Sequence, residues 1–301
     1  MATQGTYLTY DGNRKQNRDD LLDFITMLSP TENPIFDRLE KRKATNVYHE
    51  YLSHEIPRST GGNGAVEGAD YTFEELRTPD RHVNYVEEIV VPYKVSITQS
   101  LADRVGGKEL PFRRMEAMKK WKMAFEFELI HASGHSGACN TARYMKGIIT
   151  SLSKSTNASG QSVTERAFNN YIQGVWDDVS DGTYLAYMDM RIKRDISSNF
   201  ITSVVKNLEA SDVKKMTTKI DIYQSDVAKD VLLFGHRDLN NTNRMIIVQE
   251  KVLAVAMYEN PRDMDVPAIG SYTAGVIRGS GTLETLFPKG GINVENLAPT
   301  S

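Results

Sequence analysis

The pattern of hydrophobic and polar positions changes several times along the chain. Residues 1–20 are polar with scattered aromatic side chains and follow neither a helical nor a strand period, which predicts an extended N-terminal arm. After this stretch, Ser29, Pro30 and Glu32 have the spacing of a capping box with proline at the first helical position. Pro34 interrupts the pattern soon afterwards, so only short helical turns are expected here.

Two segments predict a long two-stranded ribbon. Residues 46–52 alternate apolar or aromatic side chains with polar ones, and residues 82–99 are rich in valine, isoleucine and tyrosine, as is typical of strands. The stretch between them has four glycines at positions 61–68, few large apolar residues, and too many residues for a tight turn. A two-stranded ribbon is marginally stable alone, so we expect it to lie on another surface.

Residues 108–133 predict one long helix. Apolar residues recur at steps of three and four positions: Met115, Met118, Trp121, Phe125 and Leu129. About twenty residues form a rod of about 30 Å, which Gly134 and Gly137 would end. The opposite face carries basic residues first and acidic residues later, against the helix dipole. Charges of a partner could compensate this unfavourable interaction with the helix dipole. Alternatively, the interaction is a mild energetic penalty that is tolerated for other reasons.

The rest of the chain mixes helices and strands. Ser162 and Glu165 form a second capping box that opens a helix, and another helix is expected after Asp189. Six strand-like segments follow: residues 219–225, 230–236, 244–249, 251–259, 272–280 and 281–287. This order predicts an α+β fold and disfavours a doubly wound nucleotide-binding fold, because strands and helices do not alternate regularly.

Composition narrows the class of protein. A chain of 301 residues with 40% hydrophobic content can bury a large core, and 36 basic against 39 acidic residues argues against a dedicated nucleic-acid binder. No apolar run is long enough for a membrane span or a secretory signal, so we expect a soluble protein made in the cytoplasm. Cys139 is the sole cysteine, which excludes an internal disulfide.

The sequence predicts no catalytic, cofactor-binding or metal-binding residue. His131, His135 and Cys139 are spaced four apart and would align as metal ligands on a continuous helix, but two glycines interrupt the run, so the cluster is interpreted as a helix end. The glycines at positions 61–64 and 279–281 lack the lysine and hydroxyl residue of a phosphate-binding loop. They are interpreted as a hairpin end and as a connection between two strands.

Charged residues suggest contacts between copies. Basic groups at residues 38–43 and 113–122 are ordinarily solvated, but in an assembling protein they would meet acidic residues of a neighbour. We expect the following contact residues: Arg58, Gly61, Gly62, Gly64, Glu67, Asp70, Glu74, Glu75, Arg113, Arg114 and Lys119.

Six phrases of the sequence, in this order, are similar to one family of phage major capsid proteins that was long catalogued as a domain of unknown function. They are TYDGN (residues 9–13), LLDFITMLSPTENPIFDRL (21–39), ATNVYHEYL (44–52), AVEGADYTF (65–73), TARYMKGI (141–148) and KIDIYQSD (219–226). The order of arm, glycine-rich hairpin, long helix and mixed domain also resembles the Hong Kong 97-like capsid fold. The resemblance covers nearly the whole chain.

The resemblance implies a domain organisation. It comprises an N-terminal arm (1–45), an extended loop (46–99), a peripheral domain with a spine helix at about 109–133 (100–139 and 246–301), and an axial domain (140–245). It implies a major capsid protein without enzymatic activity that self-assembles into homo-hexamers and pentamers of an icosahedral head. The partners would be a portal protein, packaged dsDNA and, where present, a scaffolding or decoration protein, in a virion assembled in the host cytoplasm.

Two alternatives stay open at this point. An encapsulin-like compartment shell would have the same fold but enclose enzymes instead of DNA. A cytoplasmic enzyme with a site assembled from distant residues would show no local motif.

Overall fold

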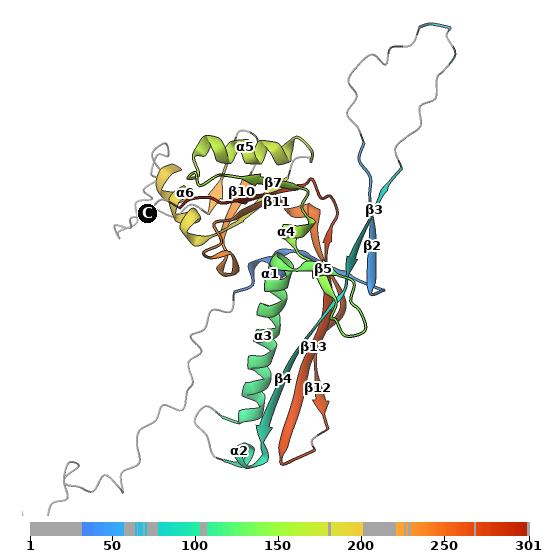
Figure 1. The fold of residues 1–301 in the computed structure, drawn as a ribbon, viewed down its shortest axis with the longest axis vertical. Coiled ribbons are helices and arrows are strands. Elements are labelled where there is room, and N and C mark those ends of the chain that lie inside the picture. Colours follow the sequence, from blue (N-terminus) through green and yellow to red (C-terminus); the bar gives the residue numbers. More distant parts are fainter. Residues whose placement is uncertain are drawn as a thin grey trace, which may run out of the picture.

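The structure is a computed structural model that describes residues 32–56, 64, 66–68, 70, 78–102, 107–179, 182–200, 221–225, 227, 230–267 and 269–299. The architecture is α+β (Figure 1). Helix α3 (Glu109–His131) runs beside a long sheet, a second sheet with its own helices lies at one end of α3, and a two-stranded ribbon projects from the same end.

A four-stranded sheet forms the body along α3. Its strand order is β1 (Glu40–Lys43), β12 (Leu253–Val266), β13 (Tyr272–Thr285) and β4 (Glu87–Ser96). Trp121, Phe125 and Leu129 of the predicted apolar face pack here and have no exposed surface, whereas Met115 of the same predicted face is 45% exposed. The short helix α2 (Ile97–Leu101) follows β4 at the far end of this body.

Two glycines allow β13 to pass under α3. The sequence suggested a connection between two strands at residues 279–282, but β13 runs unbroken through them. A Cβ atom at Gly279 would lie 2.6 Å from the Trp121 ring, and one at Gly281 would lie 2.8 Å from the Phe125 ring. The glycines therefore serve close approach of helix and strand, and the loop prediction is wrong.

A six-stranded sheet forms the second unit. Its strand order is β7 (Lys154–Asn157), β14 (Gly291–Glu295), β11 (Met245–Gln249), β8 (Thr183–Met188), β10 (Asp230–Gly235) and β9 (Ile222–Tyr223). Helices α5 (Glu165–Trp176) and α6 (Met190–Asn199) bury Phe168, Ile172 and Ile196 in its core. The Thr164 side chain, not Ser162, caps α5 by accepting a hydrogen bond from the N–H of Ala167.

The first helix of the described chain begins at a proline. Helix α1 spans Pro34–Arg38, so Pro34 opens a short helix. Proline suits the first helical position because the missing N–H would have no partner inside the helix. Ser29, Pro30 and the predicted arm up to residue 31 lie outside the described residues.

The predicted ribbon is present, but its second strand is shorter than predicted. Strands β2 (Tyr48–Ser53) and β3 (Asp80–Tyr85) pair antiparallel. The single strand expected over residues 82–99 is two strands, because after the buried Val86 the chain continues as β4 and pairs with β13 instead. A small hairpin, β5 (Ser133–His135) and β6 (Tyr144–Lys146), followed by helix α4 (Ile148–Ser151), lies beside the ribbon's base.

The two larger sheets share the C-terminal part of the chain. Strands β12 and β13 belong to the four-stranded sheet, whereas β11 and β14 belong to the six-stranded sheet. In chain order, β12 and β13 therefore lie between β11 and β14, although the two pairs belong to different sheets. Two 3-10 turns, η3 (Arg237–Leu239) and η4 (Glu250–Val252), connect strands near the junction. No helix in the described ranges is long and apolar enough to cross a membrane.

Candidate assembly surfaces

The base of the ribbon is fixed to the body by a buried carboxylate. Glu284 on β13 is 4% exposed. Its Oε1 lies 2.5 Å from His49 Nε2 on β2, and its Oε2 accepts a hydrogen bond from Arg42 Nη1 at 3.1 Å. The Thr285 N–H donates to the Tyr51 hydroxyl at 3.1 Å. His49 and Tyr51 lie on the same face of β2, so their contacts with β13 fix the direction in which the ribbon leaves the body.

The second strand of the ribbon is held in a similar way. The Asn84 side-chain amide donates to the carbonyl oxygens of Leu283 and Lys146, and its Oδ1 accepts from the Lys146 N–H. Glu87, at the start of β4, accepts a hydrogen bond from the Met145 N–H at 3.1 Å. Burial raises the pKa of Glu87 to about 7, and the nearby Glu128 carboxylate acts in the same direction.

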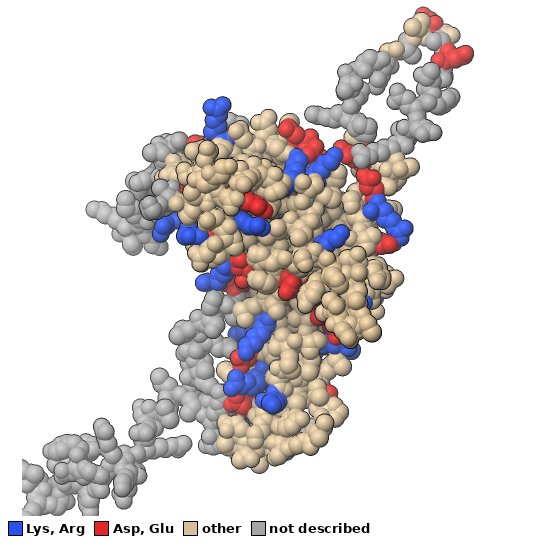
Figure 2. All heavy atoms as spheres, viewed as in Figure 1, with Lys and Arg blue, Asp and Glu red and all other residues tan. Residues whose placement is uncertain are grey.

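The ribbon exposes apolar side chains on its other face. Tyr48, Leu52 and Ile56 are 51%, 66% and 80% exposed. Residues at the glycine-rich end, among them Gly64, Glu67 and Asp70, are also exposed, and Figure 2 shows acidic side chains there. Five predicted contact residues lie outside the described part of the chain: Arg58, Gly61, Gly62, Glu74 and Glu75. Large exposed apolar side chains are a feature of surfaces that contact other proteins.

The predicted contact residues of α3 have partners within the same chain. Arg113 forms ion pairs with Glu109 at 2.7 Å and Glu116 at 2.8 Å, and the hydrogen bonds that it donates to Glu116 and Glu109 raise its pKa. Arg114 forms an ion pair with Asp263 at 2.5 Å and donates to the Tyr93 hydroxyl at 3.3 Å.

Lys119 lies on the same helix and is partly exposed. Along α3, basic and acidic side chains lie next to one another (Figure 2). The arginines do not meet the acidic ribbon end of their own subunit, and neighbouring acidic residues of the body already neutralise them.

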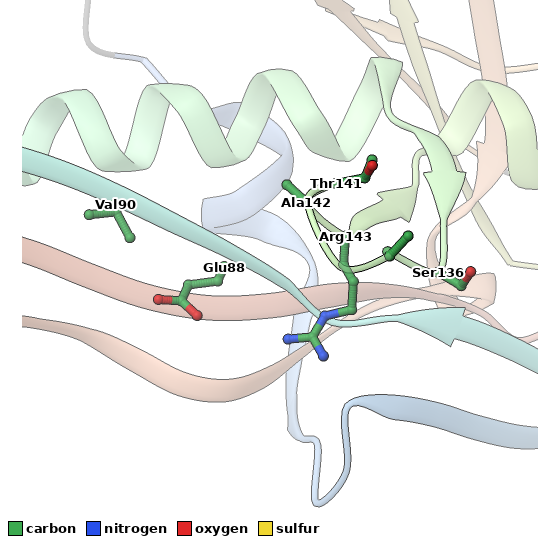
Figure 3. Close-up of a pocket in the computed structure, with 8 residues that line it drawn as sticks. Glu88, Val90, Ser136, Thr141, Ala142 and Arg143 are labelled. Carbon is green, nitrogen blue, oxygen red and sulfur yellow. The ribbon is translucent and has the colours of Figure 1, made fainter.

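A groove lies between β4 and the loop that joins β5 to β6. It has a volume of about 540 Å³ and is lined by Glu88, Val90, Ser136, Gly137, Ala138, Thr141, Ala142 and Arg143. The Arg143 side chain extends from the loop toward β4 (Figure 3). Glu88 pairs with Arg278 at 2.8 Å, whereas Arg143 forms no ion pair with another described residue. The groove thus combines Glu88 and Val90 of β4 with the guanidinium of Arg143.

The histidine and cysteine cluster does not form a site in the described chain. Helix α3 ends at His131, whose Nε2 lies 3.0 Å from the Asp238 carbonyl oxygen. His135 Nδ1 accepts a hydrogen bond from the Gly137 N–H, and Cys139 is exposed with a free thiol. Among the residues that the structure describes, no group of three histidine, cysteine, aspartate or glutamate side chains is placed to hold a metal ion.

The structure also reveals a buried polar junction that the sequence did not predict. Glu126 on α3 is 1% exposed and His236, directly after β10, is 3% exposed. His236 Nε2 lies 2.9 Å from Glu126 Oε1. The backbone N–H groups of Ile35 and Phe36 donate to the two oxygens of the same carboxylate, each at 2.8 Å. No local motif marks this contact, because its members are about a hundred residues apart in the chain.

Three solved capsid and shell structures share this fold. The capsid of cyanophage A-1(L) matches with a TM-score of 0.69 at 11% identity, covering 94% of this chain and 98% of that one. The capsid of an empty GTA particle matches with a TM-score of 0.64 at 10% identity, covering 96% and 98%. The SrpI encapsulin of Synechococcus elongatus matches with a TM-score of 0.58 at 11% identity, covering 95% and 94%.

Helix α3, the projecting ribbon and the two sheets are therefore arranged in the Hong Kong 97-like fold. A family model described as the SU10 major capsid protein matches residues 2–298, so the chain belongs to that family and is a phage capsid subunit. A search of curated protein sequences finds no match to the chain. The expected fold class and the expected capsid function are confirmed.

Proposed function

We propose that this chain assembles into homo-hexamers and pentamers that close into an icosahedral phage head around dsDNA. The ribbon is the observation that carries the proposal. Its base is held by Glu284 and Asn84, while its outer face exposes Tyr48 and Leu52 to solvent in the single subunit. An anchored base with an exposed apolar face suits an element that lies on a neighbour, and repetition by symmetry multiplies each such contact.

The domain division follows from this proposal. Residues 1–45 serve as the arm, residues 46–99 contain the extended loop, residues 100–139 and 246–301 supply the peripheral domain, and residues 140–245 supply the axial domain. Three strands pair outside the domain to which their residue numbers assign them. Strands β11 and β14 pair with strands of the axial domain, and β4 pairs with β13 of the peripheral domain. The spine helix is α3.

Contacts between copies are proposed to pair the acidic ribbon end with the groove at β4. Glu67 and Asp70 carry the negative charge, and Arg143 is a better partner than Arg113 or Arg114, which are neutralised within their own subunit. Charge complementarity of this kind sets partner orientation more than affinity. Gly64 and Gly68 suit this end of the ribbon, because glycine adapts its backbone to slightly different neighbours.

Charge reversal tests this pairing. Arg143→Glu is expected to reduce the yield of closed shells, and adding Glu67→Arg and Asp70→Arg in the same chain is expected to restore part of it. Arg166→Glu is the matched control, because it reverses an exposed basic residue on α5 that does not line the groove. Unchanged shells from Arg143→Glu would rule out the groove as the partner of the ribbon end.

Further partners of the proposed head are a portal protein, packaged dsDNA held without sequence specificity and, where present, a scaffolding or decoration protein. The subunit is proposed to act without catalysis and without a cofactor, and to assemble in the host cytoplasm before it forms the virion capsid. Its near balance of 36 basic and 39 acidic residues suits a wall that encloses DNA without condensing it.

A compartment shell is the second candidate, because the SrpI encapsulin shares the fold over 95% of this chain. Particles purified from cells that express the full phage gene set would distinguish the two functions. A head is expected to protect genome-length DNA from nuclease. Particles that contain co-purifying enzyme and no protected DNA would favour the compartment shell and contradict the proposed function.

A further inference from the structure

The buried carboxylate of Glu126 connects three parts of the molecule that are distant in sequence. Its oxygens accept hydrogen bonds from Ile35 and Phe36 in the first turn of α1, and it faces His236 at the end of β10. Glu126 itself belongs to α3, which packs on the four-stranded sheet, whereas β10 belongs to the six-stranded sheet. One side chain thus joins the N-terminal segment to the junction between the two sheets.

The hydrogen bonds around His236 indicate its tautomer. The Asp238 N–H donates to His236 Nδ1 at 3.2 Å, so this nitrogen carries no proton in that arrangement. The proton of the neutral ring is then on Nε2, which donates to Glu126 Oε1. The carboxyl group thus accepts one hydrogen bond from the six-stranded unit and two from α1.

Helix α1 depends on this carboxylate in turn. Asn33 precedes the helix but makes no side-chain capping hydrogen bond, and Pro34 has no N–H to offer. The next two N–H groups are the ones that Glu126 accepts. An unmade hydrogen bond in a buried site is unfavourable for donor and acceptor alike, so α1 and Glu126 stabilise each other.

Other contacts show that α1 is held as part of the body. Phe36 packs edge-on against Trp121 and Phe125, with ring centroids 6.3 and 5.4 Å away. Arg38 forms an ion pair with Glu250 at 2.8 Å, but both side chains are about one third exposed. Strand β1 follows directly and pairs in parallel with β12. Among the polar contacts of α1, those with Glu126 are the buried ones.

We infer that Glu126 is the positioning residue that fixes the N-terminal segment to the junction of the two sheets. Every subunit then holds the start of α1, from which the chain continues toward its N-terminus, at the same point on its body. This consequence for assembly rests on the proposed function, because a common departure point matters only where arms must reach equivalent neighbours. The anchoring itself is a property of the subunit and does not require a shell.

Hydrogen–deuterium exchange on the full chain tests the anchoring. In Glu126→Gln one acceptor oxygen is replaced by an amide that cannot accept, so the segment 33–40 is expected to exchange on the order of 10- to 100-fold faster. Peptides from β8 and β11 are expected to keep their protection. Glu250→Gln is the matched control, because it removes the exposed ion pair to the same helix and should change exchange by about twofold or less.

Two results would overturn the inference. One is unchanged protection of Ile35 and Phe36 in Glu126→Gln. The other is an equal increase in exchange across all peptides, which would mean that Glu126 supports overall stability without anchoring α1 in particular.

His236 variants provide the same test if Glu126→Gln does not fold. Gln at position 236 retains a donor toward the carboxylate, whereas Leu does not. Segment 33–40 is therefore expected to stay protected in His236→Gln and to exchange faster in His236→Leu. Equal protection in both variants would contradict the three-part junction.

Shell yield by electron microscopy separates the inference from the proposed function. If the wild-type chain forms closed shells, Glu126→Gln is expected to form fewer of them, and normal shells with a released segment 33–40 would contradict the role in assembly. If the wild-type chain forms no shells, the proposed function fails while the exchange result still decides the anchoring.

Discussion

The two ends of helix α3 use acidic residues in opposite ways. Near its start, Glu116 lies at the surface and pairs with Arg113 and Lys120 at 2.8 and 2.9 Å. Near its end, Glu126 is buried and accepts hydrogen bonds from α1 while facing His236. The first arrangement belongs to a solvated helix face, whereas the second connects separate parts of the fold. The charge of a residue alone therefore does not show whether the folded structure of this subunit depends on it.

Among the substitutions considered, Glu126→Ala is expected to lower the free energy of unfolding the most. Replacing it with alanine leaves two N–H groups of α1 and His236 without their acceptor in a buried site. We expect the free energy of unfolding to fall by about 3–5 kcal/mol, as for other broken buried pairs. Denaturant unfolding of the isolated subunit measures this change, and a loss below about 1 kcal/mol would place Glu126 with the surface pairs.

Glu87 is a second buried acidic residue, and its contribution to the free energy of unfolding depends on pH. Its pKa is raised by burial to about 7, so between its ordinary value and pH 7 the folded chain holds a proton that the unfolded chain releases. Stability from this group is present at low pH and is lost as the pH rises through that window. Glu87→Gln keeps an acceptor for the Met145 N–H and removes the charge.

We expect Glu87→Gln to be more stable than the wild type by about 2–3 kcal/mol at pH 8 and nearly equal to it at pH 4. Denaturant unfolding at the two pH values measures the difference. A constant difference across this range would mean that Glu87 is solvated like Glu116.

Gly279 tests how closely α3 lies on β13. A Cβ atom there would lie 2.6 Å from the Trp121 ring and 2.9 Å from the Pro261 Cα atom. Gly279→Ala is expected to destabilise the subunit by about 1–3 kcal/mol through overpacking. Gly174→Ala in α5 is the matched control, because nothing lies within 4 Å of the added atom, and it should stabilise the subunit by up to about 1 kcal/mol. The same sign for both variants would contradict the close approach.

The smallest effect is expected at Glu116. Hydrogen bonds from Lys120 and Arg113 lower the pKa of Glu116, but both cations are largely exposed. Glu116→Gln is therefore expected to cost about 0.5 kcal/mol or less in the free energy of unfolding. Raising the salt concentration should shrink even this difference. A loss as large as that of Glu126→Ala would remove the contrast between the two ends of the helix.

Local periodicity predicted some elements well and missed others for physical reasons. The helix expected over about 109–133 spans Glu109–His131, because its apolar side chains recur at helical steps and no glycine interrupts them. Strand β8 was not predicted, although five of its six residues are buried, because a strand covered on both faces shows no alternation.

Contacts between distant residues were harder to predict than the elements. Arg113 and Arg114 stay predicted contacts with a neighbour, and within the subunit they pair with carboxylates, of which Asp263 is far away in the sequence. Glu126 and His236 are 110 residues apart in the chain, so no local motif marks their contact. Such contacts depend on tertiary structure, which local spacing does not encode.

Particle size distinguishes a self-assembling shell subunit from a protein that stays monomeric. Sedimentation combined with negative-stain electron microscopy of the purified full-length chain is expected to show hexamers, pentamers or closed shells of uniform diameter. A homogeneous monomer that stays compact at high protein concentration would contradict self-assembly.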